Sequence, residues 1–353
     1  MKVLIIGGAG FIGCNAARKF MERGDEVIIF DNLSRKGTPS NLGWLKENGN
    51  FEFIKGDIRN YEEVKKVFEK SRNTDVVLHL AAQVAVTTSV LDPREDFEIN
   101  AFGTFNVLEA IREVYKIKSK TSGWSQVSEH SPIVIYSSTN KVYGRMEDIE
   151  VVERNGRYEY KDLLHGISES RCLDFHSPYG CSKGAADQYV IDYSRIYGLR
   201  TVSFRQSCIY GYRQFGVEDQ GWVAWFTIAS VLGKPITIYG NGKQVRDVLF
   251  IDDLVDAYIK SIEYIDKTNG KSYNIGGGPG NTLSLLELIA NLEGLLGKKI
   301  TYSFDDWRPG DQPVFICDVG RVREDLGWEP KTNPKDGVKR LSDWVKLNKN
   351  IFE

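Results

Sequence analysis

The first 31 residues constrain the fold of this chain most strongly. Lys2–Ile6 is a short apolar run that predicts a β-strand, and glycines follow it at positions 7, 10 and 13. Residues 11–23 carry a helical pattern, and residues 26–30 form a second apolar run that ends at Asp31. A strand, a glycine turn, a helix and a second strand in this order predict a doubly wound α/β fold with a parallel sheet.

The spacing of the glycines favours a dinucleotide at this turn. Gly7 permits a tight turn, Gly10 lets the backbone approach a pyrophosphate, and Gly13 lets the helix pack close to the strand. Asp31 can accept hydrogen bonds from both ribose hydroxyls of NAD, and its charge would repel a 2′-phosphate. Arg35 could instead accept the phosphate of NADP, and a glycine turn without a ligand is a further alternative. We expect NAD.

The composition favours small-molecule partners. The chain has 353 residues with 46 basic and 48 acidic side chains, so no strong field would attract nucleic acid or an anionic membrane. No apolar run reaches membrane-spanning length, and we expect a cytoplasmic protein that associates with copies of itself as a homo-oligomer. The five cysteines are widely spaced without a metal-binding pattern, which indicates reduced thiols and no metal site.

Two further strand ends extend the predicted nucleotide site. Residues 51–54 predict a third strand, after which Asp57 and Ile58 suit the edge and face of an adenine. A helix N-cap at Asp57, before a helix over residues 61–70, is an equal alternative. Residues 76–80 predict a fourth strand that opens into Ala81, Ala82 and Gln83, where small side chains would let a cofactor lie against the backbone.

The chain continues with one more helix, a fifth strand and two polar insertions. His79 lies inside the fourth apolar strand, which favours a packed, hydrogen-bonded core histidine. Residues 100–114 predict a helix, and residues 133–136 predict the fifth strand. Residues 116–131 have the composition of a surface insertion, and we expect residues 145–171 to lie over the mouth of an active site.

A tyrosine and a lysine one helical turn apart provide a candidate proton relay. Ser177 and Pro178 begin a helical pattern that runs to Gly198 and places Tyr179 and Lys183 on one face near the helix N-terminus. The ammonium and the helix N-terminus both favour the phenolate, so we expect a lowered pKa for Tyr179. Tyr179 could then take a proton from a sugar hydroxyl while hydride leaves the same carbon. A chance pair on a helix is the alternative.

The chain resembles the extended short-chain dehydrogenase/reductase superfamily over nearly its whole length. Four features carry this resemblance, namely the glycine turn, residues 79–82, the Ser138-Thr139 strand end and the Tyr179/Lys183 pair. The blocks 136–144, 174–189, 210–222 and 239–249 resemble the CDP-paratose 2-epimerases, also called CDP-tyvelose epimerases. This resemblance implies a Rossmann sheet with a smaller α/β substrate domain, bound NAD, and a role in lipopolysaccharide O-antigen synthesis.

The implied reaction converts CDP-paratose to CDP-tyvelose by inversion at C2. The sugar would be oxidised transiently to a keto-sugar, and the hydride would return to its other face. Sugar-nucleotide 4,6-dehydratases of the superfamily carry an Asp-Glu pair after the threonine, where this chain has Asn140 and Lys141. Without an acid and base at these positions elimination of water is disfavoured, and epimerisation is the simpler use of the remaining groups.

The resemblance also implies roles for individual residues. The implied catalytic residues are Thr139, Tyr179 and Lys183, with Thr139 bonding the reacting oxygen. Besides Tyr179 and Lys183, the implied contacts of NAD are Gly7, Gly10, Phe11, Ile12, Gly13, Asp31, Asn32, Ser34, Arg35, Asp57, Ile58, Leu80, Ala81, Ala82, Gln83, Asn100 and Ser137. Besides Thr139, the implied contacts of the nucleotide sugar are Thr87, Cys208, Gln214, Gln220, Gly221, Trp222, Thr237, Tyr239, Arg246, Arg308 and Asp311.

The chemistry of a sugar nucleotide favours two of these substrate residues independently. A diphosphate prefers planar, bidentate cations, which makes Arg246 and Arg308 natural candidates, although either could form an ordinary ion pair. We expect residues 1–206, with a returning strand near 272–276, to form the dinucleotide domain, and residues 207–353 to form the interleaved substrate domain.

Alternative functions are a UDP- or GDP-sugar epimerase, a ketoreductase, or a non-catalytic NAD sensor.

Overall fold

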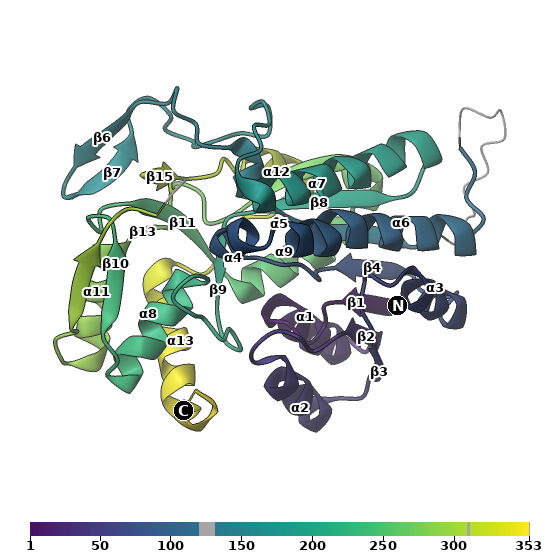
Figure 1. Cartoon of the computed structure of the whole chain (residues 1–353), viewed down its shortest axis with the longest axis horizontal. Helices are drawn as coiled ribbons and strands as arrows, with labels where there is room; N and C mark the ends of the chain where they lie inside the picture. The colour runs from purple at the N-terminus through teal and green to yellow at the C-terminus, as the bar shows by residue number, and fades with distance from the viewer. Residues whose placement is uncertain (120–130, 309–310, 353) are drawn as a thin grey trace. The chain divides into compact units, whose positions relative to one another are not determined.

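The computed structural model describes residues 1–119, 131–308 and 311–352 of the chain (Figure 1). Its contacts divide the chain into two compact units. The first unit contains Met1–Val142, Phe175–Arg205 and Val255–Tyr273, and the second contains Tyr143–Asp174, Gln206–Leu254 and Asn274–Glu353. The domain boundaries expected from the sequence stay a prediction, and these units depart from them by assigning 143–174 to the second unit and 255–273 to the first.

A seven-stranded sheet forms the centre of the first unit. Its order is β12-β8-β5-β4-β1-β2-β3, and the pairs β1–β2, β2–β3, β1–β4 and β4–β5 are parallel. The strands are β1 (Lys2–Ile6), β2 (Glu26–Asp31), β3 (Glu52–Lys55), β4 (Val76–His79), β5 (Ile133–Thr139), β8 (Thr201–Gln206) and β12 (Lys271–Ile275). The strand order reverses between β1 and β4, and ligands of doubly wound sheets bind at the carboxyl ends of the strands at such a point.

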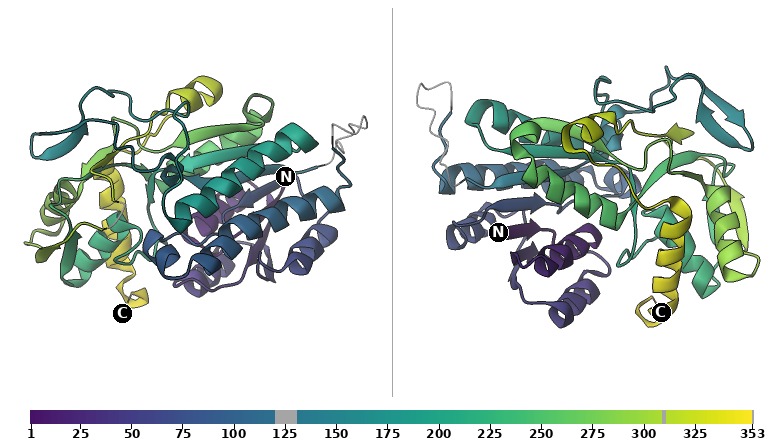
Figure 2. Two further views of the ribbon diagram at one scale, coloured as in Figure 1. Left: turned by 45° about the horizontal axis from the view of Figure 1, so that its top comes forward. Right: turned by 180° about the vertical axis from the view of Figure 1, so that it is seen from behind.

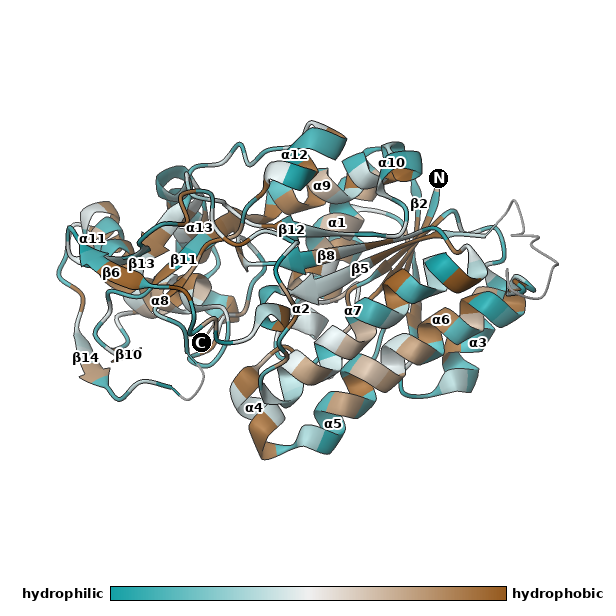
Figure 3. Cartoon of the chain, turned by 90° about the horizontal axis from the view of Figure 1, so that it is seen from above, coloured by the Kyte–Doolittle hydropathy of each residue, from teal (hydrophilic) through white to brown (hydrophobic). Residues whose placement is uncertain are grey.

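Helices cover both faces of this sheet, as the view along it shows (Figure 3). On one side lie α1, α9 and α10, and on the other lie α3, α6 and α7. The helices of the first unit are α1 (Phe11–Glu22), α2 (Thr38–Asn48), α3 (Tyr61–Lys70), α4 (Val86–Leu91), α5 (Pro93–Phe97), the π-helical turn η1 (Glu98–Phe102), α6 (Gly103–Val114), α7 (Ser177–Tyr197), α9 (Ile251–Glu263) and α10 (Ile265–Thr268). The helix α9 begins in the second unit, and the 3-10 turn η3 (Asn140–Tyr143) follows β5.

The pattern of β1 follows from burial on both faces. Leu4 and Ile6 face the hydrophobic core that includes apolar side chains of α3, α6 and α7. Val3 and Ile5 alternate with them along the strand and are buried as well. A strand that is covered on both faces has consecutive apolar residues instead of alternating apolar and polar ones. This continuous run is why β1 could be predicted from so few residues.

The described part of the second unit contains two small sheets, a hairpin and four main helices. In one sheet β11 pairs with β13, β15 and β9, and in the other β10 pairs with β14. Its strands are β6 (Val151–Arg154), β7 (Arg157–Tyr160), β9 (Cys208–Tyr210), β10 (Ile236–Tyr239), β11 (Val245–Phe250), β13 (Thr282–Ser284), β14 (Tyr302–Asp305) and β15 (Val314–Phe315). Its helices are α8 (Trp222–Leu232), α11 (Leu285–Leu296), α12 (Gly320–Leu326), α13 (Pro334–Leu347) and the short turn η4 (Lys349–Ile351).

The helix expected over residues 100–114 has a more complex start than its pattern predicts. Residues Glu98–Phe102 form a π-helical turn before α6 begins at Gly103. Of the two polar insertions, most of 116–131 lies outside the described residues, whereas 145–171 contains the antiparallel hairpin β6–β7. Within the described part of the chain, no helix combines the length and the apolar content needed to cross a bilayer. The five cysteines are free thiols, as expected.

Candidate active site

The glycine turn between β1 and α1 has the geometry that its sequence predicts. Gly7 has φ +84°, and a Cβ there would lie 2.5 Å from the backbone nitrogen of Ala81. A Cβ on Gly13 would lie 2.2 Å from the carbonyl oxygen of Gly7, so the close packing of the helix on the turn requires glycine. At Gly10 the nearest described neighbour of a Cβ would be the Gly7 oxygen at 3.2 Å, which leaves the backbone approachable by a ligand.

The start of α1 is suited to an anion. Among the described residues no side chain caps this end at Gly10, and the first turn of α1 carries no acidic residue. The backbone N–H groups at a helix N-terminus, including those of Phe11 and Ile12, are therefore candidates to bind phosphate oxygens. These features fit the pyrophosphate of a dinucleotide.

Asp31 lies at the carboxyl end of β2, beside the glycine turn. Its Oδ2 accepts a hydrogen bond from Ala9 N (3.0 Å), and its Oδ1 accepts one from Leu33 N (2.8 Å). Burial raises the pKa of this carboxyl group, and the two backbone hydrogen bonds act in the opposite direction. Each oxygen keeps a second lone pair, so Asp31 can still accept hydrogen bonds from two ribose hydroxyls.

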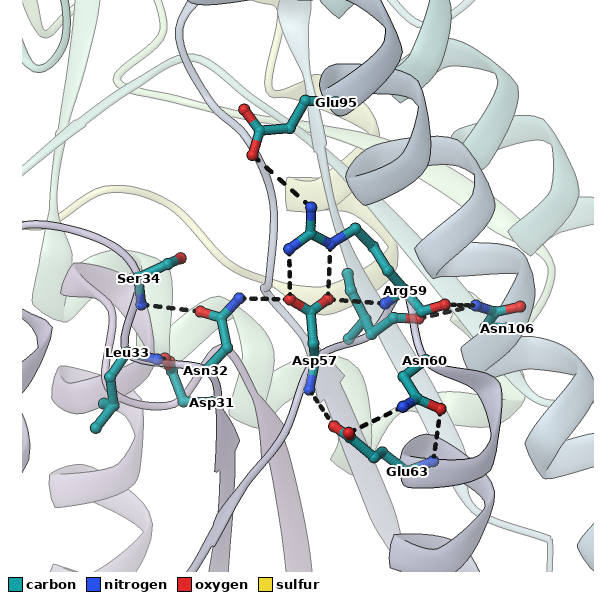
Figure 4. A network of polar contacts seen from close by, with 11 residues as sticks. Asp31, Asn32, Leu33, Ser34, Asp57, Arg59, Asn60, Glu63, Glu95 and Asn106 are labelled. Atoms are coloured by element: carbon teal, nitrogen blue, oxygen red, sulfur yellow. Dashed lines mark hydrogen bonds and ion pairs between the residues drawn. The ribbon is translucent and has the colours of Figure 1, made fainter.

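Asp57 belongs to a polar network at the end of β3 (Figure 4). Its carboxylate accepts hydrogen bonds from Asn32 Nδ2 (2.9 Å) and from Arg59. Burial favours the neutral acid, but the bonds from Arg59 and Asn32 lower the pKa of Asp57 to about 2. The alternative that Asp57 caps α3 is wrong, because Asn60 accepts hydrogen bonds from Glu62 N and Glu63 N at this helix start. Asp57 therefore connects the segment after β2 with the segment after β3.

The segment after β4 is bound to the π-helical turn η1 through Asn100. The Oδ1 atom of Asn100 accepts a hydrogen bond from Gln83 N (3.0 Å), and its Nδ2 donates to Asp96 Oδ1 (3.1 Å) and to Ser182 Oγ (3.2 Å). Asn100 thus links three segments of the first unit. His79 is a buried core residue whose Nε2 lies 2.9 Å from Thr104 Oγ1, as its strand position predicts.

Tyr179 and Thr139 meet in the first unit. The Tyr179 side chain is buried and forms a hydrogen bond with Thr139. The expectation of a lowered pKa is wrong for the chain alone, because burial raises the pKa of Tyr179 to about 12. The hydrogen bond from Thr139 and the charge of Arg35 act to lower it, whereas Asp96 acts to raise it. The removal of water from the phenol outweighs the effect of these neighbours.

Lys183 lies one turn further along α7 and is almost fully buried. Its Nζ donates a hydrogen bond to the carbonyl oxygen of Ser137 (2.5 Å) and lies 4.2 Å from the ring centroid of Tyr136. Burial lowers the pKa of Lys183 to about 7, and the carboxylates of Asp187 and Asp96 act to raise it. The structure thus places Lys183 beside Ser137, at the carboxyl end of β5.

Two buried carboxylates that act on Lys183 were not predicted as site residues. Asp187 lies one turn after Lys183 and accepts a hydrogen bond from Arg205 Nη2 (2.8 Å). Asp96 accepts hydrogen bonds from Ser182 and Asn100. The spacing of Asp187 from Lys183 on one helix was the available signal for that residue. For Asp96 the sequence offers no comparable signal, because its partners lie far away along the chain.

In the second unit, each arginine expected to bind the diphosphate has a carboxylate partner. Arg246 Nη2 lies 2.7 Å from Asp311 Oδ1, and Arg308 Nη2 lies 3.0 Å from Asp219 Oδ1. The guanidinium carbon of Arg308 also lies 3.9 Å from the ring centroid of Tyr239. In the chain without a ligand, Arg246 and Arg308 therefore both form ordinary ion pairs, which was the alternative to phosphate binding.

Other predicted substrate residues in this unit have different surroundings. Gln214 and Trp222 each hold a buried polar atom, Oε1 and Nε1 respectively, without a hydrogen-bond partner among the described residues. Gly221 precedes α8 with φ +76°. Thr87 lies in the first unit, and its buried hydroxyl also lacks a partner among the described residues. The remaining predicted substrate residues, Cys208, Gln220 and Thr237, lie in the second unit.

The fold and this site define an extended short-chain dehydrogenase/reductase. The model of the GDP-mannose 4,6 dehydratase family matches residues 4–341, and the chain belongs to this family. Over 350 residues it is 48% identical to a CDP-paratose 2-epimerase of Salmonella typhi, covering 98% of this chain and 99% of the relative.

Solved structures resemble the chain over its whole length. A UDP-glucose 4-epimerase of Thermotoga maritima, solved with UDP-glucose, has a TM-score of 0.81 at 30% identity and covers 99% of both chains. A UDP-glucuronic acid 4-epimerase of Bacillus cereus, solved with UDP-glucuronic acid and NAD, has a TM-score of 0.80 at 27% identity, with 99% of this chain and 100% of that chain covered. These findings confirm the predicted family, the fold class and the expectation of an NAD-dependent epimerase.

Proposed function

We propose that this protein inverts one carbon of a nucleotide sugar, and that its substrate is CDP-paratose, inverted at C2 to give CDP-tyvelose. The observation that carries this proposal is the group formed by Thr139, Tyr179 and Lys183 in the same unit as the glycine turn and Asp31. The likeness to the Salmonella CDP-paratose 2-epimerase, at 48% identity, supports the choice of sugar and base. The cytoplasmic location expected from the sequence stays a prediction.

Tyr179, Thr139 and Lys183 would have separate roles in a reversible oxidation of the sugar. Tyr179 would accept the proton of a sugar hydroxyl and later return it to the carbonyl oxygen, while Thr139 would hydrogen-bond the same oxygen. When bound, NAD⁺ supplies the acceptor for the hydride that leaves the sugar carbon and that later returns. Lys183, when charged, stabilises negative charge that develops on Tyr179. A raised pKa makes the phenolate of Tyr179 a stronger base toward the sugar hydroxyl, so charged groups nearby are needed to stabilise that phenolate.

Asn140 and Lys141 favour epimerisation over loss of water. They occupy the positions directly after Thr139, in the 3-10 turn η3. Asn140 is buried, and its Oδ1 lies 3.4 Å from Thr139 Oγ1. An amide cannot act as the acid or base that elimination needs. The family model carries the name of a dehydratase, but these two residues support an epimerase within that family.

The second unit supplies the candidates for binding the nucleotide. Arg246 and Arg308 form ion pairs with Asp311 and Asp219 in the chain alone. A diphosphate would compete with these carboxylates for the guanidinium groups, and planar bidentate pairing favours the phosphate oxygens. The unpartnered polar atoms of Gln214 and Trp222 are available to hydrogen-bond a substrate.

The test is an assay of stereochemistry with CDP-paratose. We expect proton NMR to detect inversion at C2 at equilibrium, without net formation of NADH, because the hydride returns to the sugar. Matched reactions with UDP-glucose, UDP-glucuronic acid and a GDP-sugar should give slower or no inversion. Formation of NADH in proportion to product would refute the redox-neutral reaction, and faster inversion of a UDP-sugar would overturn the choice of substrate.

A UDP-sugar epimerase is the second candidate, because two solved relatives carry that description. The UDP-glucose and UDP-glucuronic acid 4-epimerases match the chain at TM-scores of 0.81 and 0.80. Their identities of 30% and 27% are lower than the 48% shared with the CDP-paratose enzyme, which favours the CDP-sugar. The UDP-sugar reactions described above separate these two candidates.

We further propose that copies of the chain pair through an apolar face of α6 and α7, which lie side by side (Figure 2). Phe105 of α6 and Tyr189 of α7 are exposed, and their ring centroids lie 5.7 Å apart. Phe97 and Phe102, on the neighbouring α5 and η1, are exposed as well. Exposed aromatic side chains gathered on adjacent elements are typical of an interface between subunits.

Phe105→Glu should convert the oligomer into monomers, because a buried carboxylate without a partner would oppose association. Light scattering coupled to size-exclusion chromatography measures this directly. Phe304→Glu, at an exposed aromatic residue on β14 in the second unit, is the matched control and should leave the mass unchanged. An unchanged mass in the Phe105 variant would contradict pairing through this face.

A further inference from the structure

Asp96 is a buried carboxylate that the proposed reaction does not use. It lies on α5 and is 1% exposed. Its Oδ2 accepts a hydrogen bond from the hydroxyl of Ser182, and its Oδ1 accepts one from Asn100 Nδ2 at 3.1 Å. Burying a carboxylate has a cost of several kcal/mol when hydrogen bonds and opposite charges do not compensate it. A fold that retains such a group next to the Tyr179–Lys183 pair requires an explanation for it.

The hydrogen bonds of Asp96 tie it to the helix that carries both reacting groups. Ser182 immediately precedes Lys183, and its hydroxyl also approaches the carbonyl oxygen of Tyr179 at 3.2 Å. The amide of Asn100 donates to both Asp96 and Ser182. The carboxylate, the amide and the hydroxyl therefore form one connected cluster against the segment of α7 between Tyr179 and Lys183.

The electrostatic surroundings of Lys183 come from four elements. On its own helix Asp187 acts to raise its pKa, and Asp96 on α5 acts in the same direction. His79 of β4 is neutral, because burial and the charge of Lys183 lower the pKa of this imidazole to about 3. The ring of Tyr136 on β5 lies under the ammonium. Within the described residues, Asp96 and Asp187 are therefore the two carboxylates that act on a lysine whose burial favours loss of its charge.

We propose that Asp96 is a positioning residue for the Tyr179–Lys183 pair. From the neighbouring helix α5, Asp96 holds the proton on Lys183, and its hydrogen bonds with Ser182 and Asn100 keep α7 in register. This inference rests on the proposed function. An epimerase must use the phenol in both directions. The carboxylate of Asp96 acts to keep Lys183 protonated, and a charged ammonium on the same helix stabilises the phenolate that takes the sugar proton, which offsets the direct effect of Asp96 in raising the pKa of Tyr179.

The first test measures Lys183 itself and needs no substrate. The ε-carbon resonances of lysine, labelled with ¹³C, are followed by NMR as a function of pH, and Lys183 is assigned by its absence in Lys183→Met. In the parent enzyme this lysine should titrate near pH 7. In Asp96→Asn, which keeps the shape and removes the charge, the midpoint should fall by about one pH unit. The fraction of charged Lys183 at pH 7 then falls from about half to about a tenth.

Two variants separate charge from structure. Asp92→Asn removes an exposed carboxylate from the start of the same helix and should leave the midpoint unchanged. Ser182→Ala keeps the charge of Asp96 but removes its contact, so the midpoint should move far less than in Asp96→Asn. A lower melting temperature in Asp96→Asn with the parent midpoint for Lys183 would overturn the proposal, as would an equal shift of the midpoint in Ser182→Ala.

The second test is the pH profile of epimerisation. Because Asp96 acts to raise the pKa of both groups, both limbs of the kcat profile should move to lower pH in Asp96→Asn, as a property of the coupled pair. A normal profile despite a shifted Lys183 would refute the role of Asp96 in turnover. If Lys183 shifts but no CDP-sugar is inverted by the parent enzyme, the proposed substrate fails while the positioning role stands.

Discussion

Tyr179→Phe should lower the rate of epimerisation by about a thousandfold while leaving NAD bound. The substitution removes only the hydroxyl, which forms a hydrogen bond with Thr139 and would exchange a proton with the sugar. Transfer of a proton by a positioned side chain contributes about 10² to 10⁴ in rate, and this reaction would need the phenol twice. Single-turnover kinetics, followed by the absorbance of reduced nicotinamide, and the C2 stereochemistry assay measure the loss.

The control for this variant is the affinity for NAD, measured by calorimetry. We expect it to change little, because the pyrophosphate and ribose contacts expected at the glycine turn and Asp31 are unaffected. Thr139→Val, which removes the neighbouring hydroxyl and keeps the shape, should have a smaller effect of about tenfold, in line with the loss of one hydrogen bond. Full epimerase activity of Tyr179→Phe would overturn the proton-transfer role of Tyr179, whereas NAD binding without epimerisation by the parent protein would support the alternative of a non-catalytic NAD sensor.

The nucleotide half of the site could be predicted from sequence because its determinants are local. Gly7, Gly10 and Gly13 act within a single turn, and the requirement for glycine at two of them follows from contacts within about 3 Å of a missing Cβ. Asp31 directly follows the apolar run of β2. Such features depend on spacing along the chain, and spacing is what a sequence provides.

The electrostatics of the site could not be predicted in the same way. The pair Tyr179 and Lys183 was evident from its helical spacing, but the direction of the Tyr179 pKa depends on how much water the folded chain removes from the phenol. Asp96 meets Ser182 only after α5 and α7 have packed, 86 residues apart in the chain. Helix capping at Asn60 instead of Asp57 was ambiguous because both residue types are good caps and lie three positions apart.

Arg205→Met should destabilise the protein by about 3–5 kcal/mol. The guanidinium of Arg205, on β8, forms a buried ion pair with Asp187, on α7, at 2.8 Å, and both side chains are almost completely removed from solvent. Ser203 also donates a hydrogen bond to this carboxylate. Methionine fills much of the volume of arginine but leaves the charge of Asp187 without its cation. Urea denaturation, followed by circular dichroism, measures the change in the free energy of unfolding.

The double variant Arg205→Met, Asp187→Leu separates the contribution of this ion pair to protein stability from the effect of Asp187 on the pKa of Lys183. Replacing both charges by apolar groups should recover most of the lost stability, because no unpaired charge remains in the core. Asp187 also acts to raise the pKa of Lys183, so the double variant should titrate Lys183 at lower pH and should lose activity at neutral pH despite its recovered stability. Recovery of stability together with the parent pH profile would contradict this link, and would leave Asp96 as the carboxylate that keeps Lys183 charged.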